Sequence, residues 1–88
     1  MQIKKGFKLR RIDDLFVVIA GAAAAKDFHG MLTLNESGAF LWEKLQSPIT
    51  EEELVDALCT EYEIDRGVAS ADVQKFLSVA REQGFLND

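Results

Sequence analysis

The hydrophobic pattern of the chain changes its period at Asn35. Before this residue, side chains alternate between two faces over Met31–Leu34, which is typical of a short strand. After it, apolar residues recur at helical spacing as far as Leu45, which predicts a helix over Glu36–Gln46. The Asn35 side chain suits the N-cap of this helix, because it can accept a hydrogen bond from an amide of the first turn. We therefore expect a strand that leads directly into a capped helix.

Two further strands are predicted before this unit. Apolar and basic residues alternate over Phe7–Ile12, which is typical of a half-exposed strand near a sheet edge. Leu15–Ala20 is a continuous β-branched and aromatic run, so we expect a strand that is covered on both faces. The intervening Asp13 and Asp14 form a polar turn, and the two strands form a hairpin. Residues 21–30 are expected to be a loop, because its four alanines are too few to nucleate a helix.

A second helix begins after Thr50, where Thr50 and Glu53 have the spacing of a capping box. The apolar residues that follow share one helical face, which we expect to be buried. They are Leu54, Val55, Leu58, Cys59 and Tyr62.

A third helix follows an interruption at Arg66 and Gly67. We expect it to begin within residues 69–71 and to end at Gln83, because Gly84 suits the left-handed position after a helix. Its apolar face is formed by Val73, Phe76, Leu77 and Ala80. The last apolar residues, Phe85 and Leu86, are expected to fold back onto the core as a hydrophobic hook.

The element order is therefore βββααα. Eighty-eight residues without a linker or an internal repeat allow one domain, residues 1–88. Three strands followed by three helices predict a winged-helix-like α+β domain, with a three-stranded antiparallel sheet packed on the helices.

Charge is unevenly distributed along the chain, whose net charge is −5. The first twelve residues carry five basic side chains and no acidic one, whereas residues 36–65 carry nine acidic side chains against Lys44 alone. This pattern fits solvated faces and acidic helix starts, and it also fits docking to a charged protein partner. The acidic middle disfavours nucleic acid as a partner, although the basic first segment leaves that reading open.

No segment of the sequence has the length of apolar run that crosses a membrane, and the N-terminus lacks the apolar region of a signal peptide. The single cysteine, Cys59, excludes an internal disulfide and fits a reducing compartment. We therefore expect a cytoplasmic protein without a membrane partner.

Residues that could support catalysis or metal binding are scarce. His29 is the only histidine and is interpreted as a surface or turn residue, and Cys59 as a buried, inert thiol. Glu51–Glu53 start a helix, and the six glycines are scattered rather than gathered in a phosphate loop. We expect a protein that is not an enzyme and that needs no metal or cofactor.

Peptide binding at a sheet edge fits the pattern better. An edge strand can accept an extra strand from another chain, and we expect a groove between Met31–Leu34 and the third helix. Phe76 and Leu77 could form the wall of this groove or simply fill the core. Lys75 and Arg81 could be ordinary solvated side chains, or they could meet an acidic peptide. The same edge could also pair with a second copy of the chain to form a homodimer.

The sequence resembles the PqqD family over nearly its whole length. In residues 30–45, a Leu-Asn pair, a Gly-Ala pair and an aromatic residue precede a leucine, as in the strand-to-helix signature of that family. Residues 9–18 resemble its first hairpin, and residues 50–58 and 72–77 resemble its second and third helices.

This resemblance implies a RiPP recognition element, a small chaperone that binds the leader segment of a ribosomally synthesised precursor peptide and presents it to a modifying enzyme. In the biosynthesis of pyrroloquinoline quinone (PQQ), that enzyme is a radical SAM protein. The leader would be added as a strand to Met31–Leu34, in the cleft with the third helix. The implied peptide-binding residues are Met31, Leu32, Thr33, Leu34, Val73, Phe76, Leu77, Ala80 and Arg81. The implied architectural residues are Asn35, Gly38, Ala39 and Trp42.

Two other functions remain open from the sequence. The runner-up is a winged-helix nucleic-acid-binding protein that uses the basic segment Lys4–Arg11. The other is a structural subunit without a peptide ligand.

Overall fold

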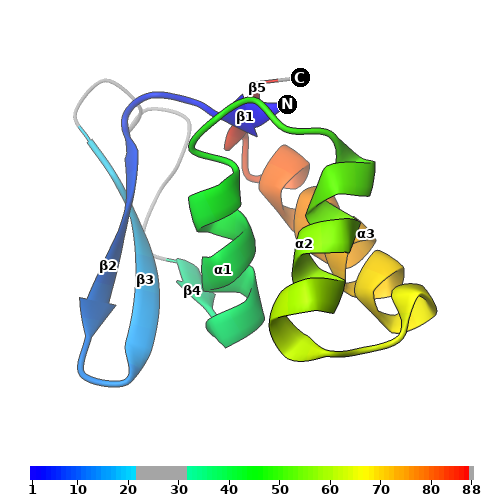
Figure 1. Ribbon diagram of the computed structural model, residues 1–88. Helices are drawn as coiled ribbons and strands as arrows, with labels where there is room; N and C mark the ends of the chain where they lie inside the picture. Colours follow the sequence, from blue (N-terminus) through cyan, green and yellow to red (C-terminus); the bar gives the residue numbers. More distant parts are fainter. Residues whose placement is uncertain (22–31, 88) are drawn as a thin grey trace.

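A three-stranded antiparallel sheet and three helices make up most of the computed structural model, which describes residues 1–21 and 32–87 (Figure 1). The strands β2 (Phe7–Ile12), β3 (Leu15–Ala20) and β4 (Leu32–Leu34) follow one another in the order β2-β3-β4. The predicted α+β fold is therefore confirmed. The predicted loop, His29 and Met31 lie outside the described residues, except for Gly21 at the loop's start.

The β2–β3 hairpin has the predicted bounds. Its pairs run from Phe7 opposite Ala20 to Ile12 opposite Leu15. Asp13 takes a left-handed backbone conformation with φ 56°, which aspartate tolerates and which a two-residue hairpin turn requires. Burial on both faces is confirmed for the middle of β3, where Val17 and Val18 are 3% and 0% exposed, but the first residue, Leu15, is 55% exposed.

Strand β4 leads directly into helix α1 (Glu36–Lys44), which ends two residues before the predicted Gln46. The carboxamide oxygen Oδ1 of Asn35 accepts a hydrogen bond from the backbone N–H of Gly38 at 2.8 Å, and another from the Ser37 hydroxyl at 3.1 Å. The predicted N-cap is confirmed. This cap fixes the direction in which the chain leaves the sheet.

Helix α2 (Glu51–Tyr62) begins with the predicted capping box. The Thr50 backbone N–H donates to the Glu53 carboxylate at 3.0 Å, and the Glu53 N–H donates to the Thr50 hydroxyl at 3.1 Å. Leu54, Val55 and Leu58 are buried, whereas Cys59 and Tyr62 are only half-buried. The predicted burial of Cys59 and Tyr62 is therefore only partial, and both pack against the core.

Helix α3 (Arg66–Glu82) begins earlier than predicted and includes both residues that were interpreted as an interruption. Gly67 lies in the first turn, where a glycine lowers the stability of the helix without ending it. Arg66 instead ties the start of α3 to α2 through ion pairs with Asp56 and with Glu52, the latter at 3.8 Å. The hydrogen bond to Asp56 raises the pKa of the Arg66 guanidinium.

The end of α3 is the predicted left-handed cap. Gly84 has φ 76°, its N–H donates to the Arg81 carbonyl at 3.1 Å, and the Phe85 N–H donates to the Ala80 carbonyl at 2.8 Å. These two bonds form a Schellman motif. The motif turns the chain back, so that Phe85 and Leu86 are buried and the predicted hook is confirmed.

Two short strands, β1 (Gln2–Ile3) and β5 (Leu86–Asn87), form a second sheet that the sequence did not predict. They bring the two ends of the described chain together (Figure 1). The Ile3 N–H donates to the Leu45 carbonyl at 2.8 Å, which attaches β1 to the end of α1 as well. Strands of two residues are too short to show a period of two, so their pattern carries no signal.

The core lies between the inner face of the sheet and the three helices. The Phe85 ring packs edge to face against the rings of Phe7 and Trp42, at centroid distances of 4.9 and 5.4 Å. The buried core residues are Ile3, Phe7, Val18, Leu41, Trp42, Leu45, Leu54, Val55, Leu58, Ala69, Val73, Leu77, Ala80, Phe85 and Leu86. None of the helices described is both long and apolar enough to span a bilayer.

Candidate functional site

The two edges of the three-stranded sheet differ in charge. Strand β2 forms one edge and carries three cations, Lys8, Arg10 and Arg11. Strand β4 forms the other edge, carries no charged side chain, and pairs only with β3 in the part of the chain that is described. Basic side chains on an edge discourage pairing with another chain. The β4 edge therefore lacks the protection that the β2 edge has.

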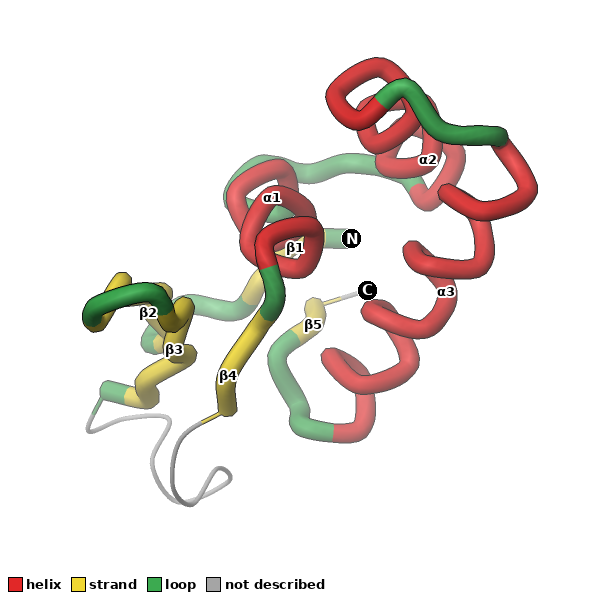
Figure 2. The backbone as a smooth tube through the Cα atoms, turned by 90° about the horizontal axis from the view of Figure 1, so that it is seen from below, coloured by secondary structure: helices red, strands yellow, loops and turns green. Residues whose placement is uncertain are grey.

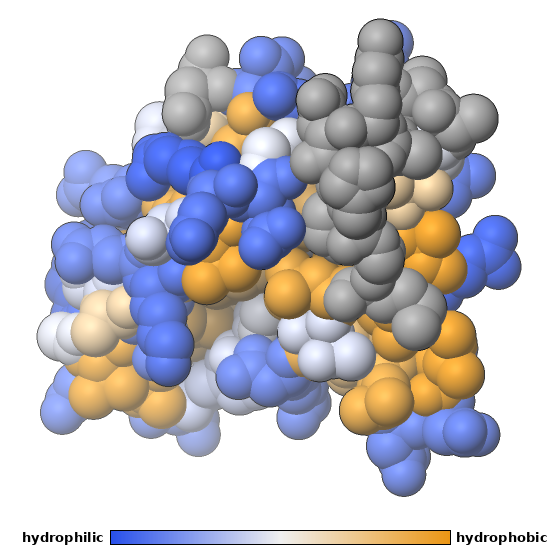
Figure 3. Space-filling view, turned by 180° about the vertical axis from the view of Figure 1, so that it is seen from behind, coloured by the Kyte–Doolittle hydropathy of each residue, from blue (hydrophilic) through white to orange (hydrophobic). Residues whose placement is uncertain are grey.

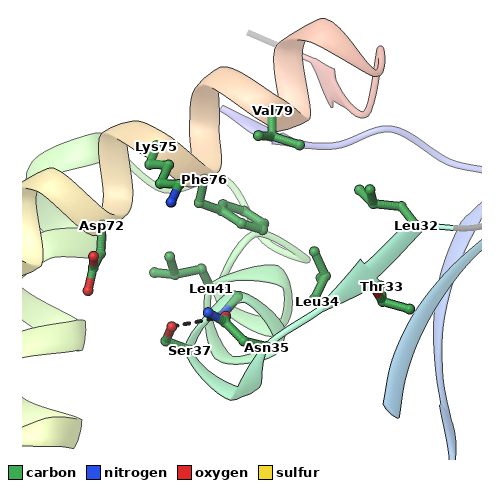
Figure 4. A pocket seen from close by; sticks show the side chains of 11 residues that line it. Leu32, Thr33, Leu34, Asn35, Ser37, Leu41, Asp72, Lys75, Phe76 and Val79 are labelled. Carbon is green, nitrogen blue, oxygen red and sulfur yellow. Dashed lines mark hydrogen bonds between the residues drawn. The ribbon is translucent and has the colours of Figure 1, made fainter.

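Strand β4 lies on the side of the sheet that is nearest to α3, and β2 lies on the far side (Figure 2). Between β4, the start of α1 and one face of α3 is a cavity of about 330 Å³, which we call the β4–α3 groove (Figure 4). Its lining residues are Leu32, Thr33, Leu34, Asn35, Ser37, Gly38, Leu41, Asp72, Lys75, Phe76 and Val79.

The groove has an apolar end and a polar end. Leu32 and Val79 lie at one end, while Asp72 lies at the other, beyond Lys75 and close to the level of Ser37 (Figure 4). Strand β4 and α3 run in opposite directions, so Val79 lies toward the start of β4 and Asp72 lies toward the start of α1 (Figure 4). A ligand that fills the groove therefore meets apolar side chains at one end and polar ones at the other.

The side chains of β4 alternate between the two faces of the sheet, as predicted. Leu32 and Leu34 are half-buried and lie on the inner face opposite Val18 and Phe16, whereas Thr33 is exposed and its side chain points away from the groove. Leu32 and Leu34 can therefore contact a ligand through their side chains, and all three residues can do so through the backbone. Met31, predicted for the same role, lies outside the described residues.

The register of α3 differs from the predicted groove wall. Val73, Leu77 and Ala80 are between 0% and 1% exposed and belong to the core, so they do not line the groove. Arg81 is exposed but is also not among the lining residues. Of the five residues predicted on this helix, Phe76 alone lines the groove, where it is half-buried.

Three other residues of α3 line the groove instead, namely Asp72, Lys75 and Val79. With Phe76 they have the spacing i, i+3, i+4, i+7 of a single helical face, which lies next to the core face. Val79 was not predicted to line the groove. Its apolar side chain lies outside the predicted apolar face of α3, and this position could have indicated a second apolar surface on the helix. Apolar side chains reach the surface between hydrophilic ones on the rear face of the molecule (Figure 3).

Other candidate groups lie away from the groove. Cys59 is a half-buried free thiol on α2, and Glu53 is engaged in the capping box. Burial, and then the negative charges of Glu36 and Glu61, raise the pKa of Tyr62, which packs against Phe40. No group of three metal-ligating side chains is found within residues 1–21 and 32–87.

Comparison with known proteins gives matches of two kinds. The chain is similar in structure to TbiB1 in complex with the TbiA(beta) leader peptide, with a TM-score of 0.73 and 26% identity, covering 99% of this chain and 100% of that one. It shares its fold with lasso peptide synthetase B1 complexed with the leader peptide, with a TM-score of 0.75 and 18% identity, covering 99% and 96% of the two chains. Comparison with curated proteins gives no significant match.

The family model described as "Coenzyme PQQ synthesis protein D (PqqD)" matches residues 21–86. The match includes β4, α1, α2 and α3, and therefore every element that forms the groove. Since it extends over well more than half of the sequence, this chain belongs to the PqqD family.

Proposed function

We propose that this protein binds the leader segment of a ribosomally synthesised precursor peptide and delivers it to a peptide-modifying enzyme. The observation that carries the proposal is the uncharged edge of β4 beside the β4–α3 groove, an edge that pairs with no other strand of the described residues. A peptide added to this edge would gain main-chain hydrogen bonds from β4. Its alternate side chains would enter the groove, which is how strand addition combines affinity with selectivity.

The size and lining of the groove suit a peptide that binds this protein with moderate affinity. Burying one large apolar side chain contributes about 1.5–3 kcal/mol, and ordering an extended peptide costs part of the gain. A dissociation constant near 1 μM corresponds to about −8 kcal/mol, which exceeds the gain from one or two such side chains, so main-chain pairing with β4 has to supply the rest. We therefore expect low-micromolar or tighter binding of the cognate leader.

The comparisons support the class of ligand. TbiB1 and lasso peptide synthetase B1 are each described in complex with a leader peptide, and the family model takes its name from coenzyme PQQ synthesis. For this chain, a non-enzymatic role, a radical SAM or other modifying enzyme as the second partner, and a place in PQQ or a related peptide pathway are parts of the proposal.

Calorimetric titration with defined peptides tests the proposal. The ligands are synthetic leader segments of any short precursor reading frames encoded next to the gene, and a scrambled peptide of the same composition is the control. We expect the cognate leader to bind with a low-micromolar or lower dissociation constant and the scrambled peptide to bind at least tenfold more weakly. Equal binding of the two, or no binding of any of the leaders, would contradict it.

Nucleic-acid binding is the second candidate, and one observation favours it. The five basic residues in the segment Lys4–Arg11 are all exposed. Binding through these residues would weaken steeply with added salt, because it would release counterions from the phosphates. Retention of duplex DNA at low salt and its release at higher salt would support this candidate, whereas no retention at low salt would remove it.

A further inference from the structure

Two opposite charges lie at the polar end of the β4–α3 groove without an ion-pair partner. Asp72 and Lys75 both line the groove from α3 and are exposed. Within residues 1–21 and 32–87, the ion pairs all involve Arg66, so neither of these charges is matched by a neighbour. A ligand that covers the groove would have to match or desolvate them.

Lys75 is the better placed of the two to contact a ligand that also fills the apolar end. Its ammonium Nζ lies over the groove beside Phe76 and Leu41, whereas Asp72 lies at the end farthest from Leu32 (Figure 4). The adjacent start of α1 presents the positive end of a helix dipole, and its Glu36 is not among the lining residues. These charges favour an acidic rather than a basic group beside Lys75.

The spacing along α3 relates this acidic group to an apolar one. Lys75 and Val79 are four residues apart, which is about 6 Å along a helix. Side chains on one face of a strand repeat every two residues, which is about 6.6 Å. A strand that runs along α3 can therefore place one side chain beside Lys75 and the side chain two residues away beside Phe76 and Val79.

We propose that the groove selects an extended peptide with an aspartate or glutamate two residues from a large apolar residue, and that Lys75 is the residue that selects the acid. This inference rests on the proposed function and adds to it the chemistry of the recognised segment. When the peptide covers the groove, the pair between Lys75 and the carboxylate is partly withdrawn from water. The attraction is then stronger than for a surface pair.

Selection from a random-peptide display library on the immobilised wild-type protein tests the motif. We expect enriched peptides to share an acidic residue two positions before or after a large apolar one. Enrichment of apolar residues alone, or of lysine and arginine, would overturn the inference and leave leader binding standing. Failure to enrich any peptide would contradict both.

A charge-exchange experiment with one enriched peptide then assigns the role to Lys75. K75Q should weaken binding about three- to tenfold, the range of a charge-assisted contact, and should change binding less than twofold when the peptide acid is replaced by its amide. K75E should prefer a peptide with lysine in place of the acid. K8Q, the same loss of charge on the opposite sheet edge, is the matched control, and equal effects of K75Q and K8Q would overturn the assignment.

Discussion

At the scale of single residues, the junction between β4 and α1 depends on the absence of a side chain at Gly38. A Cβ atom at this position would lie 3.1 Å from Oδ1 of Asn35 and 3.3 Å from the Cβ of Leu34, closer than most real contacts of this kind. The Asn35 cap and the end of β4 thus pack closely against the backbone of Gly38. A Cβ atom at Gly67, also in the first turn of a helix, would meet no atom within 4 Å beyond its chain neighbours and its own helix backbone.

We predict opposite effects for the same substitution at these two glycines. Gly67→Ala should stabilise the protein by about 0.5–1 kcal/mol, because alanine loses less backbone entropy than glycine on helix formation. Gly38→Ala should destabilise it by about 1 kcal/mol or more, because crowding of the cap and of Leu34 outweighs that gain. Urea unfolding of both variants measures the difference, and equal stabilisation by both would contradict the close packing at Gly38.

Phe76 and Phe40 provide a second matched pair. Both are half-buried aromatic residues, but Phe76 lines the β4–α3 groove, whereas Phe40 packs against Tyr62. Phe76→Ala should weaken binding of the cognate leader at least tenfold, because it removes the largest apolar contact in the groove. Phe40→Ala should change affinity less than threefold. Calorimetry well below the unfolding temperatures of both variants checks this, and equal losses would place the peptide elsewhere.

At the scale of elements, local signals predicted most of the fold. The Asn35 cap, the Thr50–Glu53 capping box and the Gly84 terminator depend on a few neighbouring residues, so the sequence shows them directly. The start of α3 was not predicted, because glycine has a low helix propensity, and the ion pairs that tie Arg66 to α2 cannot be read from the local pattern. Strands β1 and β5 were missed because they are held by partners far along the chain.

The candidate site was also predicted only in part from the sequence. That β4 and the third helix would enclose a groove followed from the element order, but which face of α3 would line it did not. Val73 and Val79 are both apolar residues of one helix, and only tertiary packing places the first in the core and the second in the groove.

The missed strand β1 leads to a prediction at the same scale. Ile3 is 7% exposed and packs into the core next to β5. Ile3→Ala should destabilise the protein by about 2–4 kcal/mol, because it removes buried methyl groups and leaves a cavity. Lys5→Ala, two residues further along and exposed, should have little effect. Denaturant unfolding compares the two, and equal stabilities would mean that β1 does not hold the core.

At the scale of the whole molecule, the two edges of the three-stranded sheet differ in charge. The β2 edge carries basic side chains, and the β4 edge is uncharged and stands beside an apolar groove whose far end carries Lys75. This asymmetry lets a small domain accept an added strand on one side without exposing both sides to aggregation. We therefore expect the ligand to add to β4 and not to β2.

Hydrogen exchange of backbone amides, measured with and without the cognate leader peptide, distinguishes the two edges. We predict that the peptide slows exchange in Leu32–Leu34 and along the groove face of α3, while Phe7–Ile12 exchanges at its original rate. Binding that leaves the exchange of β4 unchanged, or that slows exchange in β2 instead, would show that the peptide does not add to β4.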